Sequence, residues 1–273
     1  MLLVLAELES TVEIVSILSR HQSADPARCI LPGEQKTLLK ADNLSPSVEP
    51  ASDHSLLVTF SRRICPEANG RVRKLFAALE ARQPAGMTNL HPAYSSLLVD
   101  FDPLRISLDV ATGAVCSALK DDALPEEAGR LVEIPVLYGG NEGPDINDVA
   151  AACRLTVEEV VRRHCAPEYL VYFLGFSPGF PYLGGMDPAL ATPRLDSPRK
   201  LVPAGSVAIG GSQTGIYPAA SPGGWRIIGR TPLRLFDPKR RQPTLLEMGC
   251  RVRFLPISNA EPARRAKGLL WSD

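Results

Sequence analysis

The 273-residue chain lacks the short motifs that self-contained enzymes often carry. It has no G-x-x-x-x-G-K-[ST] phosphate loop, no G-x-G-x-x-G turn, no G-x-S-x-G elbow and no H-E-x-x-H motif. Its six cysteines include no C-x-x-C pair and its four histidines are isolated, so we expect no disulfide framework and no metal site. These absences argue against a self-contained ATPase, dehydrogenase, serine hydrolase or zinc protease.

The chain also lacks an excess of charge of either sign and a long hydrophobic run. Thirty Lys and Arg balance thirty Asp and Glu, and the sequence pI is near 6.9. Nucleic acids and anionic membranes attract basic surfaces, so we expect neither as a partner. No apolar stretch reaches the ~20 residues of a membrane span, and scattered unpaired cysteines are typical of a reducing compartment. We therefore expect a cytoplasmic protein.

Residues 1–50 are expected to be an N-terminal extension that the fold does not need. No basic region precedes the first apolar residues, and acidic residues interrupt them, which argues against a signal peptide. Apolar residues instead recur at helical spacing, which predicts an amphipathic helix, at Leu5, Leu8, Val12 and Val15.

Residues 51–128 are expected to form a small α+β domain. Strands are predicted at 56–60 and 94–101, the second ended by Asp102-Pro103. Between them, an apolar stripe over 72–79 predicts a helix ended by the turn at 83–86. A poorer helix over 105–119, interrupted by Gly113, leads into a strand at 132–138.

Residues 129–258 are expected to form a β-barrel domain that begins with a short helix pair. The helices are predicted at 145–153 and 156–164, the second opened by the capping box Thr156-x-x-Glu159. The pair resembles a helix-turn-helix, but the neutral charge balance and the acidic start of its second helix argue against DNA binding. Later strands, each bounded by Gly or Pro, predict a closed or nearly closed barrel, at 171–174, 207–209, 225–228, 233–236 and 252–254. Residues 259–273 are expected to be a solvated tail.

Glycine is concentrated in one part of this domain, since eleven of the 21 glycines fall between Gly175 and Gly229. Prolines and aromatic residues are interleaved with them, which is unlike a flexible linker. Tight corners of a barrel explain the pattern, and a rigid recognition surface built from loops explains it as well. Aromatic residues such as Phe176, Phe180 and Trp225 are more often core than ligand platform.

Four long segments of this domain carry a family resemblance. They are RLVEIPVLYGG (130–140), FLGFSPGFPYLGG (173–185), PAGSVAIGGSQTGIYP (203–218) and SPGGWRIIGRTP (221–232). The chain resembles the allophanate hydrolase subunit 1 / kinase A inhibitor family, which comprises subdomains C and D of the carboxyltransferase domain, and within it the B subunits of bacterial 5-oxoprolinases.

The resemblance implies a fold and a function. The fold is α+β, a small α+β domain followed by a cyclophilin-like β-barrel. The function is that of the B subunit of an ATP-dependent 5-oxoprolinase, which opens 5-oxo-L-proline to L-glutamate with separate A and C subunits and is inactive alone. Inhibition of a histidine kinase, or a carboxyltransferase-like role in a urea carboxylase or allophanate system, are the alternatives.

His164 is the candidate catalytic residue, because the family has a His before its F-L-G-F-x-P-G-F motif and imidazole exchanges protons near neutrality. A helix-end His stabilised by the helix dipole is the alternative. Candidate substrate-binding residues are an amide, a phenol and three guanidinium groups near the glycine-rich loops, namely Gln213, Tyr217, Arg194, Arg199 and Arg230. ATP is the implied cofactor, and glycine-loop backbone or arginines would have to hold its phosphates.

Overall fold

The computed structural model describes residues 46–120 and 129–258. The chain divides into two compact units, which meet in sequence between residues 127 and 128. The amphipathic helix predicted near the start and the tail predicted from residue 259 lie outside the described residues. No described helix is both long and apolar enough to cross a membrane.

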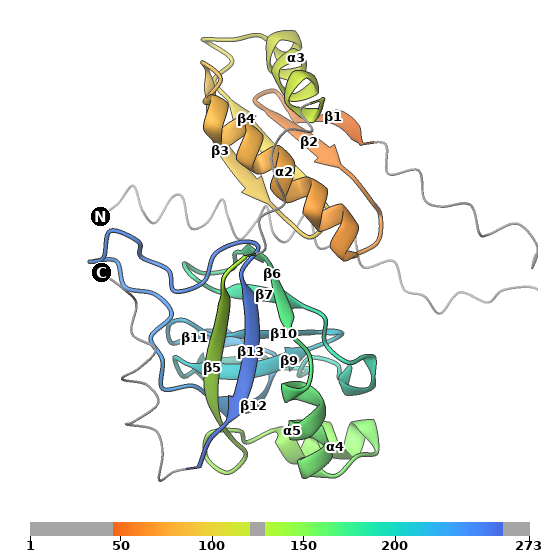
Figure 1. The fold of residues 1–273 in the computed structure, drawn as a ribbon, viewed down its shortest axis with the longest axis vertical. Helices are drawn as coiled ribbons and strands as arrows, with labels where there is room; N and C mark the ends of the chain where they lie inside the picture. The colour runs from red at the N-terminus through yellow and green to blue at the C-terminus, as the bar shows by residue number, and fades with distance from the viewer. Residues whose placement is uncertain (1–45, 121–128, 259–273) are drawn as a thin grey trace, which may run out of the picture. The chain divides into compact units, whose positions relative to one another are not determined.

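The first unit is an antiparallel sheet of four strands packed against two helices (Figure 1). The strands follow the order β1-β2-β4-β3, with bounds β1 Ser47–Ser52, β2 Ser55–Thr59, β3 Met87–Pro92 and β4 Ser96–Phe101. The helices are α2, Pro66–Arg82, and α3, Leu108–Leu119. The expected apolar stripe of α2 meets the sheet, because Val72, Leu75 and Leu79 share one buried cluster with Leu56 and Val99.

The sequence located most of this unit but not its edges. The structure confirms both predicted helices and both predicted strands within a few residues, and Gln83 ends α2 with a left-handed backbone. The strands β1 and β3 were missed, because both are largely exposed and have little apolar alternation. Since β1 runs from Ser47 to Ser52, it crosses the expected boundary at residue 50.

The second unit is a closed barrel of seven strands, which confirms the predicted barrel and the α+β class. Around the barrel the order is β10-β7-β6-β13-β5-β12-β9, and β13 pairs in parallel with β5. The bounds are β5 Leu131–Tyr138, β6 Tyr169–Leu174, β7 Pro181–Gly184, β9 Ser206–Gly210, β10 Gln213–Ile216, β12 Arg226–Arg230 and β13 Arg251–Pro256. Two further strands, β8 Arg199–Val202 and β11 Ser221–Gly223, form a separate ribbon.

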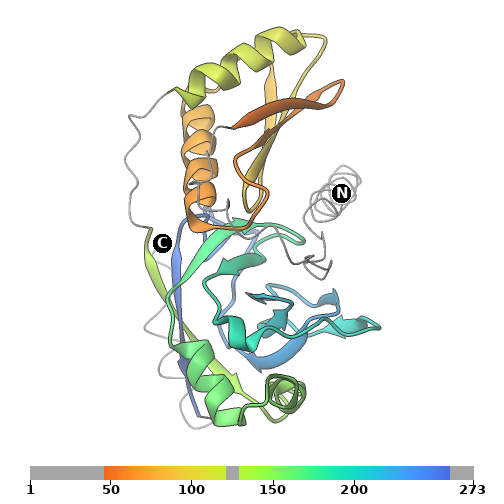
Figure 2. The same cartoon turned by 90° about the vertical axis from the view of Figure 1, so that its right-hand side faces the viewer.

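Two short helices, α4 (Ile146–Cys153) and α5 (Val157–Cys165), lie side by side at one end of the barrel (Figure 1 and Figure 2). The Thr156 hydroxyl caps α5 as predicted, accepting from the Glu159 backbone N–H at 3.2 Å. The Glu159 carboxylate, however, binds Arg162 and Arg163 at 2.7–2.8 Å. The capping box is therefore half formed, because guanidinium groups take the carboxylate that was expected to close it.

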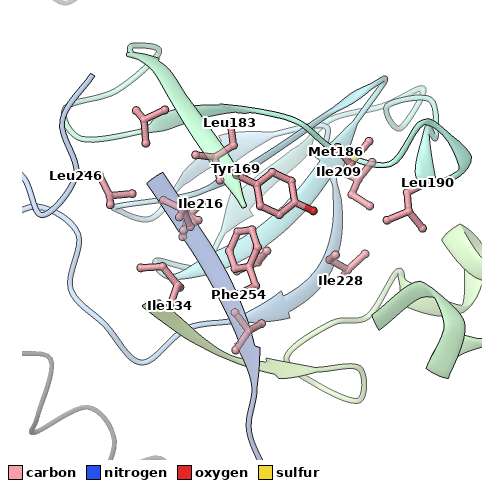
Figure 3. Packing of buried hydrophobic residues seen from close by; sticks show 14 of the residues in the cluster. Ile134, Tyr169, Leu183, Met186, Leu190, Ile209, Ile216, Ile228, Leu246 and Phe254 are labelled. Carbon is pink, nitrogen blue, oxygen red and sulfur yellow. The ribbon is translucent and has the colours of Figure 1, made fainter. Parts of the chain in front are cut away.

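The barrel interior is filled by aliphatic side chains around two aromatic rings. Tyr169 from β6 and Phe254 from β13 lie 5.2 Å apart, ring centroid to centroid, near the centre of the cluster (Figure 3). Aliphatic residues from the surrounding strands, such as Ile134, Ile209 and Ile216, are fully buried against them. Because the interior is packed, any ligand of this unit has to bind at the barrel surface or at its loops.

The strand predicted at 233–236 is wrong. Its Leu235 is buried, but the segment makes only an isolated bridge, between Phe236 and Thr244, and prolines flank it. The strands β7, β8, β10 and β11 were missed, because each has four residues or fewer and most contain Gly or Pro. The expected reduced thiols agree with the structure, in which all five described cysteines are free.

Candidate functional site

A cavity of about 160 Å³ opens on the barrel domain at the glycine-rich loops. We call it the aromatic pocket, because five of its lining side chains are Phe176, Phe180, Tyr182, Tyr217 and Trp225. Arg194 also lines it. Each of the three glycine-rich segments found in the sequence contributes to this lining.

Phe180 is the centre of the aromatic pocket. Its ring centroid lies 5.1 Å from that of Tyr182, 5.2 Å from that of Tyr217 and 5.6 Å from that of Trp225. Two of these three contacts are edge-to-face, the geometry that aromatic quadrupoles favour. The walls therefore support one another, and the pocket exists without a ligand to form it.

Phe176 joins the pocket from a tight turn with an unusual backbone. Its φ of 66° lies in the left-handed region, which non-glycine residues rarely adopt. Two hydrogen bonds close the turn, from Phe180 N–H to the Ser177 carbonyl at 3.0 Å and from Gly175 N–H to the Phe180 carbonyl at 3.1 Å. Such strain persists only where the surroundings hold it, and it is concentrated at functional sites.

Three strand glycines make room for the rings of the aromatic pocket. A Cβ atom on Gly210 of β9 would lie 2.5 Å from the Trp225 ring, and one on Gly215 of β10 would lie 2.9 Å from Phe180. A Cβ atom on Gly223 of β11 would clash with Tyr217. These glycines are needed for the close approach of a ring, which is a packing reason rather than a turn.

Arg194 is the only charged side chain among the described residues that line the pocket. Its guanidinium carbon lies 5.8 Å from the centroid of the Trp225 ring, within the range of a cation–π contact. It makes no ion pair and no hydrogen bond with any residue of the described ranges 46–120 and 129–258. Its donors are therefore available to an anion that enters the pocket.

The two tyrosines of the pocket stay protonated at neutral pH. Burial raises the pKa of Tyr182 to about 12, against the opposing effect of Arg194. Burial likewise raises the pKa of Tyr217, although the Trp225 backbone N–H, which bonds to its hydroxyl, and the nearby Arg194 and Arg199 act in the opposite direction. Both hydroxyls can therefore serve a ligand as neutral hydrogen-bonding groups.

Arg199 lies near the pocket but is held by a buried carboxylate. Its Nη2 atom is 2.5 Å from Oδ1 of Asp145, and the other oxygen of Asp145 accepts from the Ile227 backbone N–H at 2.7 Å. Asp145 is only 4% exposed, so this ion pair fastens β8 to the start of α4 and to β12. Gln213 begins β10, three residues before the end of that strand, and does not line the aromatic pocket.

Arg230 belongs to a second, larger hollow of about 410 Å³. Its Nε donates to the Ala204 carbonyl at 2.8 Å, and its Nη1 lies 3.4 Å from a Glu142 carboxylate oxygen. Arg234, which lines the same hollow, is paired with Asp237 at 3.1 Å. The structure thus brings Tyr217 and Arg194 together, with Arg199 close by, and places Arg230 and Gln213 elsewhere.

His164 is fully buried in the barrel unit and lines neither cavity. The Thr214 hydroxyl donates to the Ala208 carbonyl at 3.0 Å, so it accepts from His164 Nε2–H at 2.9 Å. His164 Nδ1 then accepts from the Tyr138 hydroxyl at 2.7 Å. Each nitrogen of the ring has one partner, and the hydrogen bonds run in one direction from Tyr138 to Ala208.

The surroundings of His164 favour its neutral form. Burial lowers the pKa of its imidazole from 6.5 to about 3, and the ring lies 4.5 Å from that of Phe254, centroid to centroid. A cation that complements the helix dipole is therefore not what the structure holds, although His164 does lie in the last turn of α5. Its catalytic role stays a prediction, and its position is that of a packed, hydrogen-bonded core residue.

The fit of metal and nucleotide can be judged from the same residues. No group of three or more His, Cys, Asp or Glu able to hold a metal occurs among the described residues. For ATP, the larger hollow offers Arg230 and Arg234, but each is paired with a carboxylate and Glu142 adds a negative charge there. These described residues do not form a cradle for a triphosphate.

Comparison with known proteins agrees with this architecture and identifies the family. The model of the carboxyltransferase domain, subdomain C and D, matches residues 46–246. The chain belongs to this family. The matched range begins one residue before β1 and ends near the isolated bridge at Thr244.

Curated relatives within the family share one name. The chain is 42% identical to the 5-oxoprolinase B subunit of Bacillus subtilis (strain 168) over 225 residues, 78% of this chain and 94% of that protein. It is 44% identical to the 5-oxoprolinase B subunit of Escherichia coli O157:H7 over 230 residues, 84% and 96% of the two chains. A urea amidolyase of Lachancea kluyveri matches at 24% identity, over 14% of its length.

Solved structures give the same picture. A crystal structure of TTHA0988 superposes with a TM-score of 0.68 and 41% identity, covering 75% of this chain and 40% of that one. The chain therefore spans less than half the length of that protein. The Kluyveromyces lactis urea amidolyase, at 20% identity and a TM-score of 0.66, shares the fold of the carboxyltransferase subdomains with this chain.

Sequence reasoning missed the aromatic walls as site residues. Phe176, Phe180 and Trp225 were assigned to the core, and Tyr182 was not singled out. Both descriptions hold in part, because Phe180 is 2% and Trp225 6% exposed and both line the cavity. The signal was the alternation of glycine with aromatic residues, which indicates rings packed against bare backbone.

Proposed function

We propose that this chain is the B subunit of an ATP-dependent 5-oxoprolinase, which opens 5-oxo-L-proline to L-glutamate together with separate A and C subunits. The observation that supports this most is the 42–48% identity to three curated proteins, all named as B subunits of 5-oxoprolinase, over 76–96% of their lengths. The match extends across both compact units, so it is not confined to one common domain.

The aromatic pocket supports a binding role within such a complex better than a complete catalytic centre. Opening a lactam needs an activated carbonyl carbon and a proton for the departing nitrogen. The described lining contains one arginine and two protonated tyrosines but no carboxylate, imidazole or thiol. We infer that the partner subunits supply the remaining groups, and that this chain alone does not turn over the lactam.

ATP would supply the driving force for opening a resonance-stabilised lactam. Because the arginines of the larger hollow are already paired with carboxylates, we assign ATP to another subunit of the complex. A cytoplasmic location follows from this proposal, since ATP and free thiols such as those of the described cysteines both belong there.

The test is reconstitution from purified subunits. The chain is mixed with the A and C subunits of its own source, and glutamate formation from 5-oxo-L-proline and ATP is followed. The proposal predicts glutamate from the three-protein mixture and none from this chain alone. Robust turnover by the isolated chain, or no turnover by the complete mixture, would refute it.

The same preparation separates this function from kinase inhibition. A protein inhibitor of a histidine kinase would lower kinase autophosphorylation without supporting any lactam opening. The proposal predicts glutamate formation and no effect on an added histidine kinase from the same source. Inhibition of the kinase without glutamate formation would favour the inhibitor function instead.

A further inference from the structure

We propose that the aromatic pocket is where this chain itself binds 5-oxo-L-proline, with Arg194 as the partner of the ligand carboxylate. This inference rests on the proposed function and adds which subunit holds the substrate and by which groups. The ligand class is a compact, uncharged ring that carries one carboxylate.

The first argument is the shape and chemistry of the walls. The aromatic pocket is small, about 160 Å³, and Phe180 holds Tyr182, Tyr217 and Trp225 in mutual contact around it. Small-molecule sites are typically concave, largely apolar and formed in advance, with few polar groups. A rigid wall also reduces the entropy lost on binding. A flat five-membered ring can lie against such walls.

The second argument is the state of Arg194. Other arginines around it are occupied, since Arg199 is paired with Asp145 and Arg226 with Asp148. Arg194 instead rests over the Trp225 ring with its donors unused by any described residue. A guanidinium group is suited to a carboxylate through two parallel hydrogen bonds. The charge and its position thus select an anion whose uncharged part enters the pocket.

The third argument concerns the amide of the ligand. The Tyr217 hydroxyl accepts from the Trp225 backbone N–H, so its own proton remains available. Tyr217 lines the pocket and is neutral at physiological pH, so it can donate to the lactam carbonyl. The product, L-glutamate, adds an ammonium group and a second carboxylate, and the described lining has no acidic side chain for the ammonium. The pocket should therefore prefer the lactam to its product.

The experiment measures binding to the full chain by tryptophan fluorescence. The chain has two tryptophans, so a Trp271→Phe background leaves Trp225 as the only reporter. We expect a saturable change with 5-oxo-L-proline and much weaker responses to 2-pyrrolidinone, which lacks the carboxylate, and to L-glutamate. Absence of a saturable change with 5-oxo-L-proline, or equal affinity for 2-pyrrolidinone, would overturn the inference.

Three variants locate the site. Arg194→Gln should weaken binding by about 10-fold or more, and Tyr217→Phe by about 3-fold to 10-fold, the range for charged and neutral hydrogen bonds. Arg234→Gln is the matched control, because it removes an arginine that lines the other hollow, and binding should not change. Circular dichroism and thermal midpoints verify that each variant is folded. Unchanged affinity in Arg194→Gln, or a loss confined to Arg234→Gln, contradicts the assignment.

The complex separates this inference from the proposed function. In the reconstituted enzyme, Arg194→Gln should raise the KM for 5-oxo-L-proline by a factor similar to its loss of affinity. Glutamate formation with an unchanged KM would leave the proposed function standing and overturn the pocket assignment. Binding by the chain, sensitive to Arg194, without glutamate formation by the complex would do the reverse.

Discussion

Replacing His164 tests whether this residue belongs to the core or to the chemistry. His164→Ala removes a fully buried ring that lies 4.5 Å from Phe254 and accepts a hydrogen bond from Tyr138. Loss of a large buried side chain leaves a cavity, and the Tyr138 hydroxyl loses its acceptor. Together these effects should lower the free energy of unfolding of the barrel unit by about 3–5 kcal/mol. A helix-end cation on the surface would contribute only about 0.3–1 kcal/mol.

The pH dependence of stability gives a second, independent signature of His164. Its imidazole has a pKa of about 3 in the folded chain, below the value of 6.5 expected when unfolded. Between these values the unfolded state binds the extra proton, so stability is fully present above about pH 6.5 and is lost as the pH falls. From pH 7 to pH 5 the loss from this one group is about 2 kcal/mol.

The assay is urea denaturation at pH 7 and pH 5, followed by circular dichroism. His164→Gln is the comparison, because it keeps one hydrogen-bonding position without a titrating ring. Wild-type chain should lose about 2 kcal/mol more than His164→Gln between the two pH values. A cost of His164→Ala below about 1 kcal/mol, or an identical pH response in both proteins, would refute the assignment of His164 to the core.

Three further predictions concern stability. Gly113→Ala, in α3 where an added Cβ meets nothing within 4 Å, should stabilise the first unit by up to about 1 kcal/mol in thermal unfolding, and a loss of stability would contradict the helix geometry. Asp145→Ala, which strands a buried N–H and an arginine, should cost on the order of 3 kcal/mol, whereas the exposed control Asp148→Ala should cost less than about 1 kcal/mol; equal losses would count against the buried ion pair. A chain that begins at residue 53 should melt about 4 °C or more below one that begins at residue 46, because it lacks β1, and equal midpoints would mean that β1 adds nothing.

The sequence predicted the fold well wherever apolar periodicity was strong. The stripe of α2 and the buried run of β4 appeared at their expected places, because burial on one face leaves a clear pattern. Short strands such as β10 and β11 could not be found this way, because they consist largely of Gly, Pro and polar residues. Their pairing is dictated by neighbours that lie far away in the sequence, which no local pattern reveals.

The candidate site was predicted only in part for a related reason. Arg194 and Tyr217 were named from their place beside glycine-rich loops, and the structure brings both to one cavity. Arg230, from the same kind of loop, pairs with Glu142 in another hollow, since barrel closure separates segments that look alike in sequence. His164 is polar and titratable, but only the fold shows that Tyr138 and Thr214 satisfy its ring.

The most direct test of the central claim is a titration of this chain into fixed amounts of the A and C subunits. Glutamate formed from 5-oxo-L-proline and ATP is measured at each ratio. If the chain is the B subunit, the rate should rise from near zero and reach a plateau at a fixed stoichiometry of this chain to A and C. An equal rate without this chain, or no glutamate at any ratio, would contradict the account.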